Sequence, residues 1–297
     1  MNTHALNKVR MMGQNLLQAW SVKGYIDPDA MMSIANEVNQ LDYKTLTQII
    51  REFQQFLPQQ ANAGETDNYT PEFFSWLQKS ASSSAREVVP ILLELVQPRS
   101  VIDVGCGTGA WLSVFMEHGL DVIGMDGHYV KRDQLLIPPD RFLAYDLEKP
   151  IQLDRTFDLV LSLEVAEHLA PGAAEIFVQS LCRLGSVVCF SAAIPFQGGV
   201  NHVNEQWPNY WVDIFQKNQY AVIDGIRNRI WENQKVAVWY QQNTLLFARR
   251  DVIENNPQLR CDYRPDRHDL ARVHPKMFLT TAMQGVLGTL ARRTGKS

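Results

Sequence analysis

The chain has 297 residues, which is enough for one large domain with extensions or for two modest domains. Its 45% hydrophobic and 20% charged content is that of an ordinary globular protein, and no stretch approaches the roughly 20 apolar residues that cross a bilayer. The 28 basic and 32 acidic residues give a net charge of −4, which favours a small molecule or glycan over a nucleic acid as partner. We therefore expect no transmembrane segment and no nucleic-acid partner.

The N-terminus and the cysteines bear on cellular location. The opening stretch MNTHALNKVRMMGQ lacks the continuous apolar block of a secretory signal, so we expect a cytoplasmic protein. Cys106, Cys182, Cys189 and Cys261 have neither CxxC nor zinc-type spacing. This pattern predicts reduced thiols that serve as small core residues.

The apolar pattern predicts four segments along the chain. Helical spacing predicts a helical extension over residues 1–60, a polar linker with a lid helix over 61–84, and an amphipathic helix within a tail over 251–297. Two helices are expected before residue 98, and Pro90 starts or kinks the second. The N-terminal extension is a candidate surface for homodimerisation or docking, and residues 85–250 form the main domain.

Short apolar runs after residue 100 alternate with helical stretches. They predict seven β-strands, within residues 100–104, 121–126, 141–146, 157–163, 186–193, 220–225 and 243–250. Strands separated by helices indicate an α/β fold, a doubly wound, mostly parallel, Rossmann-like sheet that follows the helical extension. The last two runs predict an antiparallel edge pair.

A glycine-rich loop follows the first predicted strand. In VIDVGCGTGAW, Gly105, Gly107 and Gly109 let the backbone turn sharply and approach a ligand closely. Doubly wound folds bind nucleotides at this place. The spacing is GxGxG, and Asp103 precedes it, which suits a cationic ligand better than a diphosphate.

Acidic residues also follow the next two predicted strands. Asp126 lies about twenty residues past the glycines, where a carboxylate accepts hydrogen bonds from ribose hydroxyls. Asp146 and Leu147 follow the third strand, where a carboxylate accepts from an adenine amine and a leucine covers the ring. Three consecutive strands thus end in acidic residues.

These motifs together resemble class I S-adenosylmethionine-dependent methyltransferases. The resemblance rests on DVGCGTG, Asp126, YDLE and FDLVLSLEVAEHL, and it covers roughly residues 85–250. It implies that S-adenosylmethionine is the cofactor and that the glycines line its methionine moiety. It also implies that Asp126 holds the ribose, that Asp146 and Leu147 flank adenine, and that residues 161–164, with Glu164, lie near the sulfonium.

The stretch SLEVAEHLAPG follows the fourth predicted strand. Glu164, Glu167 and His168 share one face if the stretch is helical, and this face would overhang the cofactor cleft. In one interpretation the acids only cap a helix. In a second, His168 is a general base that takes the proton of an acceptor hydroxyl.

A third interpretation is a metal site. The pattern ExxEH resembles ubiquinone-biosynthesis O-methyltransferases and small-RNA 2′-O-methyltransferases, in which such residues bind magnesium or a similar ion. The resemblance implies Glu164, Glu167, His168 and His202 as ligands of Mg²⁺ or another divalent ion.

Later stretches indicate the acceptor. Residues 192–211 are dense in hydrogen-bonding and aromatic side chains, which suits a polyhydroxylated or aromatic acceptor. Trp231, Trp239 and Tyr240 are candidates for a wall of the acceptor pocket, with Arg227 and Arg229 meeting an acidic group, and core packing is the equal alternative for this group. The stretches NHVNEQW and WYQQN resemble bacterial methyltransferases of surface-glycan or natural-product assembly. We therefore expect a small-molecule, sugar or glycan-intermediate acceptor.

We therefore predict a methyltransferase that modifies a hydroxyl group, with His168 as general base and with Glu167 and His202 as further catalytic residues. One alternative is an NAD-dependent oxidoreductase, against which the GxGxG spacing and the lack of a Tyr-x-x-x-Lys pair argue. Another is a non-catalytic binding or scaffold subunit. RNA methylation would require a basic track near His168 and His202, and N-methylation stays open.

Overall fold

A computed structural model describes residues 71–195, 197–263, 270–274 and 277, with side chains from residue 78 onward. The chain divides into two compact units, residues 68–270 and residues 1–67 with 271–297. The helices predicted within residues 1–60, the linker up to residue 70 and the C-terminal helix beyond Met277 lie outside the described residues. The sheet and the candidate site both lie in the unit of residues 68–270.

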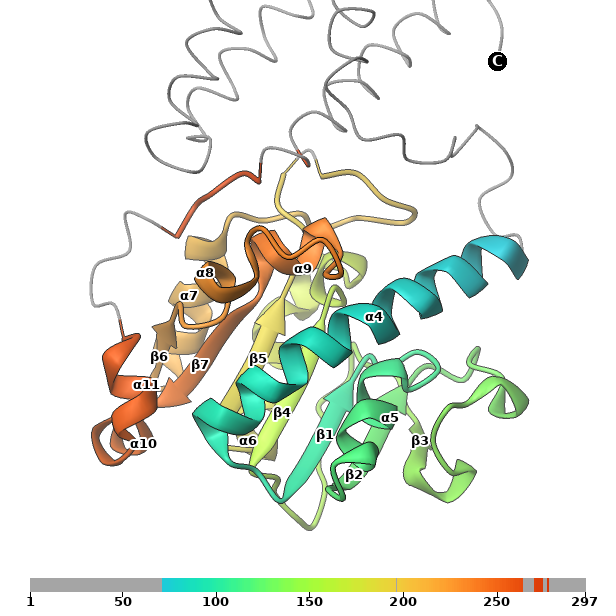
Figure 1. Ribbon diagram of the computed structural model, residues 1–297, viewed down its shortest axis with the longest axis horizontal. Helices are drawn as coiled ribbons and strands as arrows, with labels where there is room; N and C mark the ends of the chain where they lie inside the picture. Colours follow the sequence, from blue (N-terminus) through green and yellow to red (C-terminus); the bar gives the residue numbers. More distant parts are fainter. Residues whose placement is uncertain (1–70, 196, 264–269, 275–276, 278–297) are drawn as a thin grey trace, which may run out of the picture. The chain divides into compact units, whose positions relative to one another are not determined.

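A seven-stranded sheet in the order β3-β2-β1-β4-β5-β7-β6 forms the centre of this unit (Figure 1). All neighbouring strands are parallel except β7, which is antiparallel to both β5 and β6. The predicted fold class and the antiparallel pair are confirmed, although β7 lies inside the sheet and only β6 is at that edge. The strands are β1 (Ser100–Val104), β2 (Asp121–Asp126), β3 (Phe142–Ala144), β4 (Leu159–Leu163), β5 (Val187–Ser191), β6 (Tyr220–Ile223) and β7 (Leu245–Arg249).

The register of the parallel strands brings their carboxyl ends to one edge. Val104 pairs with Met125 of β2, and Leu163 of β4 pairs with Ser191 of β5. Loops that leave these strands therefore begin side by side. Ligands of open α/β sheets bind at this edge.

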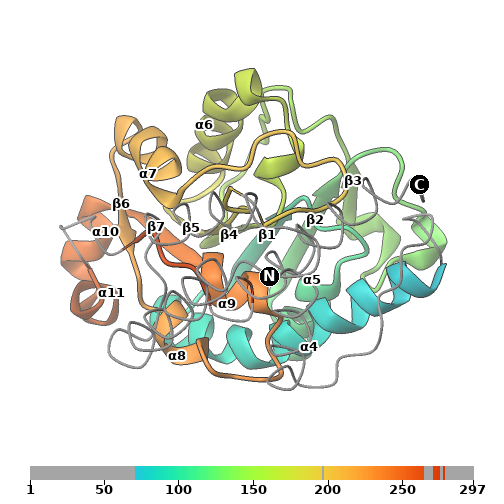
Figure 2. The same ribbon diagram turned by 90° about the horizontal axis from the view of Figure 1, so that it is seen from above.

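Helices cover both faces of the sheet (Figure 2). One hydrophobic core joins the sheet to α4 and α5 and includes residues of α8 and α9, and a second joins its other face to α6 and α7. Such a three-layer arrangement buries both faces, which is why the parallel strands are almost continuously apolar. The helices are α4 (Pro71–Val96), α5 (Ala110–Glu117), α6 (Ala174–Leu184), α7 (Pro208–Lys217), α8 (Arg227–Ile230), α9 (Val238–Asn243), α10 (Arg250–Asn255) and α11 (Pro257–Cys261).

One long helix replaces the two helices predicted before residue 98. α4 runs for 26 residues and contains Pro90. Val88, Val89 and Leu92 are fully buried on its sheet side, whereas Pro90 is exposed. The hydrogen bond that proline removes therefore faces water, and the buried stripe continues past it.

The chain beyond Arg250 is more structured than its polar sequence indicates. α10 and α11 follow β7, and the Asn256 side chain donates a hydrogen bond of 2.9 Å to the Leu95 carbonyl of α4. None of the four cysteines, all of which lie in the described residues, forms a disulfide, in agreement with the predicted reduced thiols. The prediction that all four lie in the core is wrong for Cys261, which is exposed, and Cys182 is only partly buried. Within the described residues, no helix has the length and apolar character needed to cross a membrane.

Two residues considered for acceptor contact are buried instead. Tyr240 packs edge-on against Trp111 with ring centroids 5.1 Å apart, which supports the alternative of core packing. Arg227 is fully buried, which supports the alternative of core packing over contact with an acidic group of the acceptor. Its guanidinium donates to both carboxylate oxygens of Asp224, at 2.8 and 2.6 Å, and to the carbonyls of Gln242 and Leu270.

Arg227→Met will lower the free energy of unfolding by about 3–5 kcal/mol, because it leaves the Asp224 carboxylate buried and uncompensated. The measurement is urea denaturation of the full chain. The control is Arg229→Met on the same helix, whose half-exposed ion pair with Glu94 contributes about 1 kcal/mol or less. Equal losses in the two variants would contradict the prediction.

Candidate functional site

The glycine loop leaves β1 at the carboxyl edge of the sheet. Gly105, Gly107 and Gly109 all have positive φ, at 89°, 54° and 83°. A Cβ atom on Gly105 would collide with the side chain of Val165, so glycine is required there by both conformation and space. The loop thus lies directly against the residues that follow β4.

Asp126, at the end of β2, reaches the glycine loop. Its side chain is 4% exposed, and its Oδ2 accepts a hydrogen bond of 2.6 Å from the Gly107 amide. Its Oδ1 accepts from the Gly127 amide at 2.6 Å and from the hydroxyl of Tyr129 at 2.5 Å. The structure therefore brings the predicted ribose acid and the predicted loop together.

Tyr129 is a residue of this site that the sequence analysis missed. Its ring is 80% exposed, and its hydroxyl nevertheless binds the buried Asp126. Tyr129 follows Asp126 by three positions, and this spacing is the signal that the sequence offered. A phenol held over Asp126 places an aromatic ring beside the expected ribose position.

Asp103 lies one strand residue before the glycine loop and is 2% exposed. Burial raises the pKa of its carboxyl to about 7, and the nearby charge of Asp126 adds to the effect. At neutral pH the group is close to half-protonated. A cation beside it would favour its ionised form.

The adenine prediction concerns Asp146 and Leu147, which lie just beyond β3. Asp146 is exposed and its Oδ1 accepts from the Glu148 amide at 3.1 Å, whereas Leu147 is buried. Both residues are at the same edge as Asp126, because β3 and β2 are parallel neighbours. The assignment of the two residues to adenine stays a prediction.

The prediction of a helix over SLEVAEHLAPG is wrong. Glu164 has a φ of 56°, in the left-handed region, and only Ala166–His168 form a short 3-10 turn, η3. A second such turn, Pro171–Ala173, follows. Glu164, Glu167 and His168 therefore do not share a helical face, and their relation is set by a sharp turn after β4.

The turn separates the environments of the two glutamates. Glu164 is partly exposed, and its carboxylate oxygens accept hydrogen bonds from Asn243 at 3.1 Å and from Gln197 at 2.8 Å. Glu167 is fully buried, and neither of its carboxylate oxygens has a hydrogen-bond partner among the described residues. Burial, followed by the charge of Glu164, raises the pKa of Glu167 well above its usual range.

His168 and His202 meet beside Glu167. Their ring centroids are 4.8 Å apart in an edge-to-face arrangement. One ligand atom from each of Glu167, His168 and His202 lies within 4.8 Å of the others. Three of the four residues predicted as metal ligands thus come together, and Glu164 is not part of this group.

Backbone contacts and a second acid fix His202. The Val203 and Asn204 amides donate to the Glu167 carbonyl at 2.9 and 3.0 Å, which places the 201–204 loop over η3. Nδ1 of His202 lies 2.9 Å from Oε1 of Glu205. Glu205 therefore orients the imidazole, a role that the sequence analysis missed.

His168 is the more exposed of the two histidines. Burial on one side lowers its pKa from 6.5, and the charge of His202 acts in the same direction. A hydrogen bond to the backbone of Asn201 opposes the shift. The imidazole is therefore mainly neutral at pH 7, with one ring nitrogen able to accept a proton.

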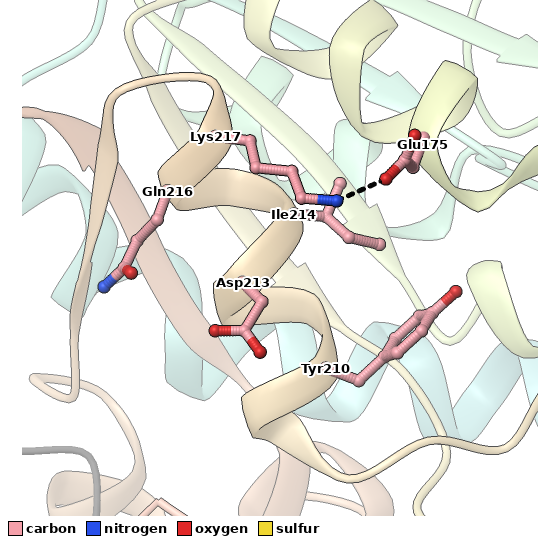
Figure 3. Close-up of a pocket in the computed structure, with 6 residues that line it drawn as sticks. All are labelled: Glu175, Tyr210, Asp213, Ile214, Gln216 and Lys217. Carbon is pink, nitrogen blue, oxygen red and sulfur yellow. Dashed lines mark hydrogen bonds and ion pairs between the residues drawn. The ribbon is translucent and has the colours of Figure 1, made fainter.

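A separate pocket lies between α6 and α7 (Figure 3). The Lys217 ammonium and the Glu175 carboxylate form an exposed ion pair across it, with Nζ and Oε1 2.5 Å apart. It shares no residue with the carboxyl edge and is not the candidate site. Its lining comprises Glu175, Tyr210, Asp213, Ile214, Gln216 and Lys217.

Residues 76–234, more than half of the chain, match the family model described as a methyltransferase domain. The chain belongs to this methyltransferase family. With the seven-stranded order of its sheet, it is a class I S-adenosylmethionine-dependent methyltransferase, and the oxidoreductase alternative has no support. No match was found among curated proteins.

Several solved structures are similar to the chain. DesVI of Streptomyces venezuelae is 14% identical, covering 63% of this chain and 100% of its own, with a TM-score of 0.46. CalS10, a SAM-bound amino pentose methyltransferase from Micromonospora echinaspora, is 16% identical over 63% and 99%, with a TM-score of 0.45. The methyltransferase domain of bacterial CtHen1-C is 20% identical over 57% and 98%, with a TM-score of 0.41. At such identities no acceptor and no catalytic residue transfers to this chain.

Asp103→Asn removes a buried carboxyl group whose ionisation lowers the stability of the folded protein. The carboxyl has a pKa of about 7 when folded against 3.8 ordinarily, so the folded protein retains a proton that the unfolded chain has lost. Its contribution to the free energy of unfolding therefore falls as pH rises from about 4 to 7. Relative to wild type, the variant should gain about 3 kcal/mol between pH 5 and pH 8.

Urea denaturation of both proteins at the two pH values measures this gain. Asp140→Asn, at an exposed position in the turn Pro139–Arg141, is the matched control. A free-energy difference between Asp103→Asn and wild type that stays constant with pH would contradict the buried-acid interpretation.

Proposed function

We propose that the chain transfers the methyl group of S-adenosylmethionine to a hydroxyl group of a small-molecule, sugar or glycan-intermediate acceptor, with His168 as the general base. The observation that carries this proposal is the position of the neutral, accessible His168 imidazole at the edge that bears the glycine loop and Asp126. A base must be unprotonated at the working pH and open to the acceptor, and His168 meets both requirements.

The cofactor is assigned along the strand ends. Gly105, Gly107 and Gly109 would line its methionine moiety, and Asp126 would hold the ribose hydroxyls. Asp146 and Leu147 would flank the adenine. Asp103 and Glu164 would add negative charge near the sulfonium, which suits a cationic cofactor.

The reaction is an in-line displacement. A lone pair of the acceptor oxygen forms the bond to the methyl carbon, the carbon–sulfur bond breaks, and its electron pair stays on sulfur as S-adenosylhomocysteine. The hydroxyl proton passes to the free ring nitrogen of His168. The sulfonium already activates the methyl group, so the protein acts by orientation, exclusion of water and proton removal.

His168→Ala should lower kcat by about 10²–10⁴-fold, because it removes the base, and should leave the Kd of S-adenosylhomocysteine unchanged. A labelled-methyl assay on the first acceptor found among hydroxylated sugars, glycan intermediates and phenols measures kcat, and calorimetry measures Kd. His118→Ala, an exposed histidine at the end of α5, is the control.

The pH profile provides a second test of the base. Since the pKa of His168 is lowered, kcat/KM should fall to half only at a pH below 6.5, where the imidazole becomes protonated. A wild-type rate in His168→Ala would contradict the proposal. Wild type that fails to bind S-adenosylhomocysteine would instead favour a non-catalytic subunit.

A second candidate mechanism adds a divalent ion. Glu167, His168 and His202 offer one carboxylate and two imidazoles, a donor set that suits Mn²⁺ and, less well, Mg²⁺. The unpartnered, buried carboxylate of Glu167 is the observation in its favour. A bound ion would lower the pKa of the acceptor hydroxyl and orient it.

Calorimetric titration with Mn²⁺ alone tests the ion. Wild type and His118→Ala should bind it, whereas Glu167→Gln and His202→Ala should bind at least about tenfold more weakly, because each loses a ligand. Mn²⁺ should also raise the Tm of the first pair but not of the second. Absence of Mn²⁺ and Mg²⁺ binding to wild type would exclude the ion and leave His168 as the base alone.

A further inference from the structure

Glu164 adopts a backbone conformation that L-amino acids other than glycine seldom use. Its φ is 56°, and its amide donates to both the carbonyl and the hydroxyl oxygen of Ser191, each at 3.0 Å. These contacts tie the residue to the end of β5. Residues that are held in such strained conformations cluster at ligand-binding and active sites, so the Glu164 side chain is a candidate functional group.

An amide clamp, formed by Gln197 and Asn243, holds the Glu164 carboxylate. Asn243 Nδ2 donates to Oε1 at 3.1 Å, and Gln197 Nε2 donates to Oε2 at 2.8 Å. Gln197 lies in the loop after β5, and Asn243 lies at the end of α9. Two elements far apart in sequence thus converge on one carboxylate.

The orientation of the two clamp amides is fixed. Asn243 Nδ2 also donates to Gln197 Oε1 at 2.9 Å, and Gln242 Nε2 donates to Asn243 Oδ1 at 3.0 Å. The amide oxygens are thereby engaged, and the amide nitrogens face Glu164. Two donors that point at two oxygens match an ionised carboxylate, which only accepts, better than a neutral acid.

The charge of His202 favours the ionised form of the held carboxylate. Within the described residues, no lysine or arginine forms an ion pair with Glu164. Its sequence neighbour Val165 touches Gly105 of the glycine loop. A carboxylate held beside this loop, with no lysine or arginine partner among the described residues, fits a cation brought by the ligand.

We propose that Gln197 and Asn243 are positioning residues that hold the Glu164 carboxylate to receive the α-ammonium group of the cofactor's methionine moiety. This inference rests on the proposed function, which assigns the methionine moiety to the glycine loop. Glu164 would contact the cofactor, whereas Gln197 and Asn243 would act through Glu164 alone. The clamp therefore sets affinity for one charged group of the ligand.

Two ligands that differ in one group test this assignment. S-adenosylhomocysteine carries the α-ammonium and a neutral sulfur, and its deamino analogue carries hydrogen in place of the amino group. Calorimetry with both ligands on the full chain separates recognition of the ammonium from binding of the rest of the molecule. The sulfur is neutral in both, so a change in its charge does not contribute.

Glu164→Gln should weaken S-adenosylhomocysteine by at least about tenfold, because a charge-assisted hydrogen bond is lost, and should leave the analogue within about twofold of wild type. Gln197→Ala and Asn243→Asp should weaken S-adenosylhomocysteine by about three- to tenfold, again without effect on the analogue. Gln197 is only half-buried and Asn243→Asp is isosteric, so both variants should retain the wild-type circular dichroism spectrum.

Gln241→Leu is the matched control. Gln241 is buried on the same helix, but its amide donates to the Asn233 carbonyl and not to the clamp. This variant should bind both ligands as wild type does. Equal losses for the two ligands in the clamp variants, or no loss for either, would overturn the inference, while failure of wild type to bind S-adenosylhomocysteine would overturn the proposed function itself.

Discussion

The hydrogen bond from the Gly107 amide to the Asp126 carboxylate, 2.6 Å long, joins the two strand ends on which the site depends. The amides of Gly105 and Cys106 add two further bonds to the Met125 carbonyl of β2. On its other side, the loop presses Gly105 against Val165 after β4. The loop is therefore held between its two neighbours in the sheet, and the strand register alone brings the acids of β1, β2 and β4 to one place.

This convergence has an electrostatic cost. Asp103, Asp126, Glu164 and Glu167 gather at one edge, and in the described part of the chain none of them pairs with lysine or arginine. Burial accordingly raises the pKa of Asp103, Glu164 and Glu167. Repulsion between these acids lowers the stability of the ligand-free protein. It also favours a ligand that carries positive charge, as the sulfonium and ammonium of S-adenosylmethionine do.

The sequence predicted the fold well because its signals are local. Each strand is a short run of buried aliphatic residues, and the glycine loop and Asp126 follow strands at the spacing that a parallel sheet requires. The two-helix prediction before residue 98 failed because Pro90 lies on the exposed side of α4, where a missing hydrogen bond is tolerated. The prediction of a helix at Glu164 failed because the spacing of Glu164, Glu167 and His168 also occurs in a non-helical turn. The positive φ of Glu164, which produces this turn, has no signal in the spacing.

Other features of the site depend on contacts that periodicity does not encode. Gln197 and Asn243 reach Glu164 from positions 33 and 79 residues away. Both lie in stretches that stood out in the sequence, residues 192–211 and WYQQN, but nothing there indicates a common partner. The sequence likewise assigned no role to Glu205, whereas its oxygen holds the His202 ring. Such side-chain partners can be identified only from the structure, because the sheet determines which loops lie close together.

Glu164 and Glu167 of the stretch SLEVAEHLAPG show how different side-chain partners give two nearby carboxyl groups different properties. They are three positions apart, yet the Glu164 carboxylate receives two amide hydrogen bonds and that of Glu167 receives none from the described residues. Burial raises the pKa of both groups; the amides oppose the rise at Glu164, whereas the charge of Glu164 adds to the rise at Glu167. Environments that make the pKa values of two carboxyl groups differ in this way suit the groups to different roles. Glu164 is suited to present an ionised carboxylate to a cationic ligand, and Glu167 to take up a proton or a cation beside His168 and His202.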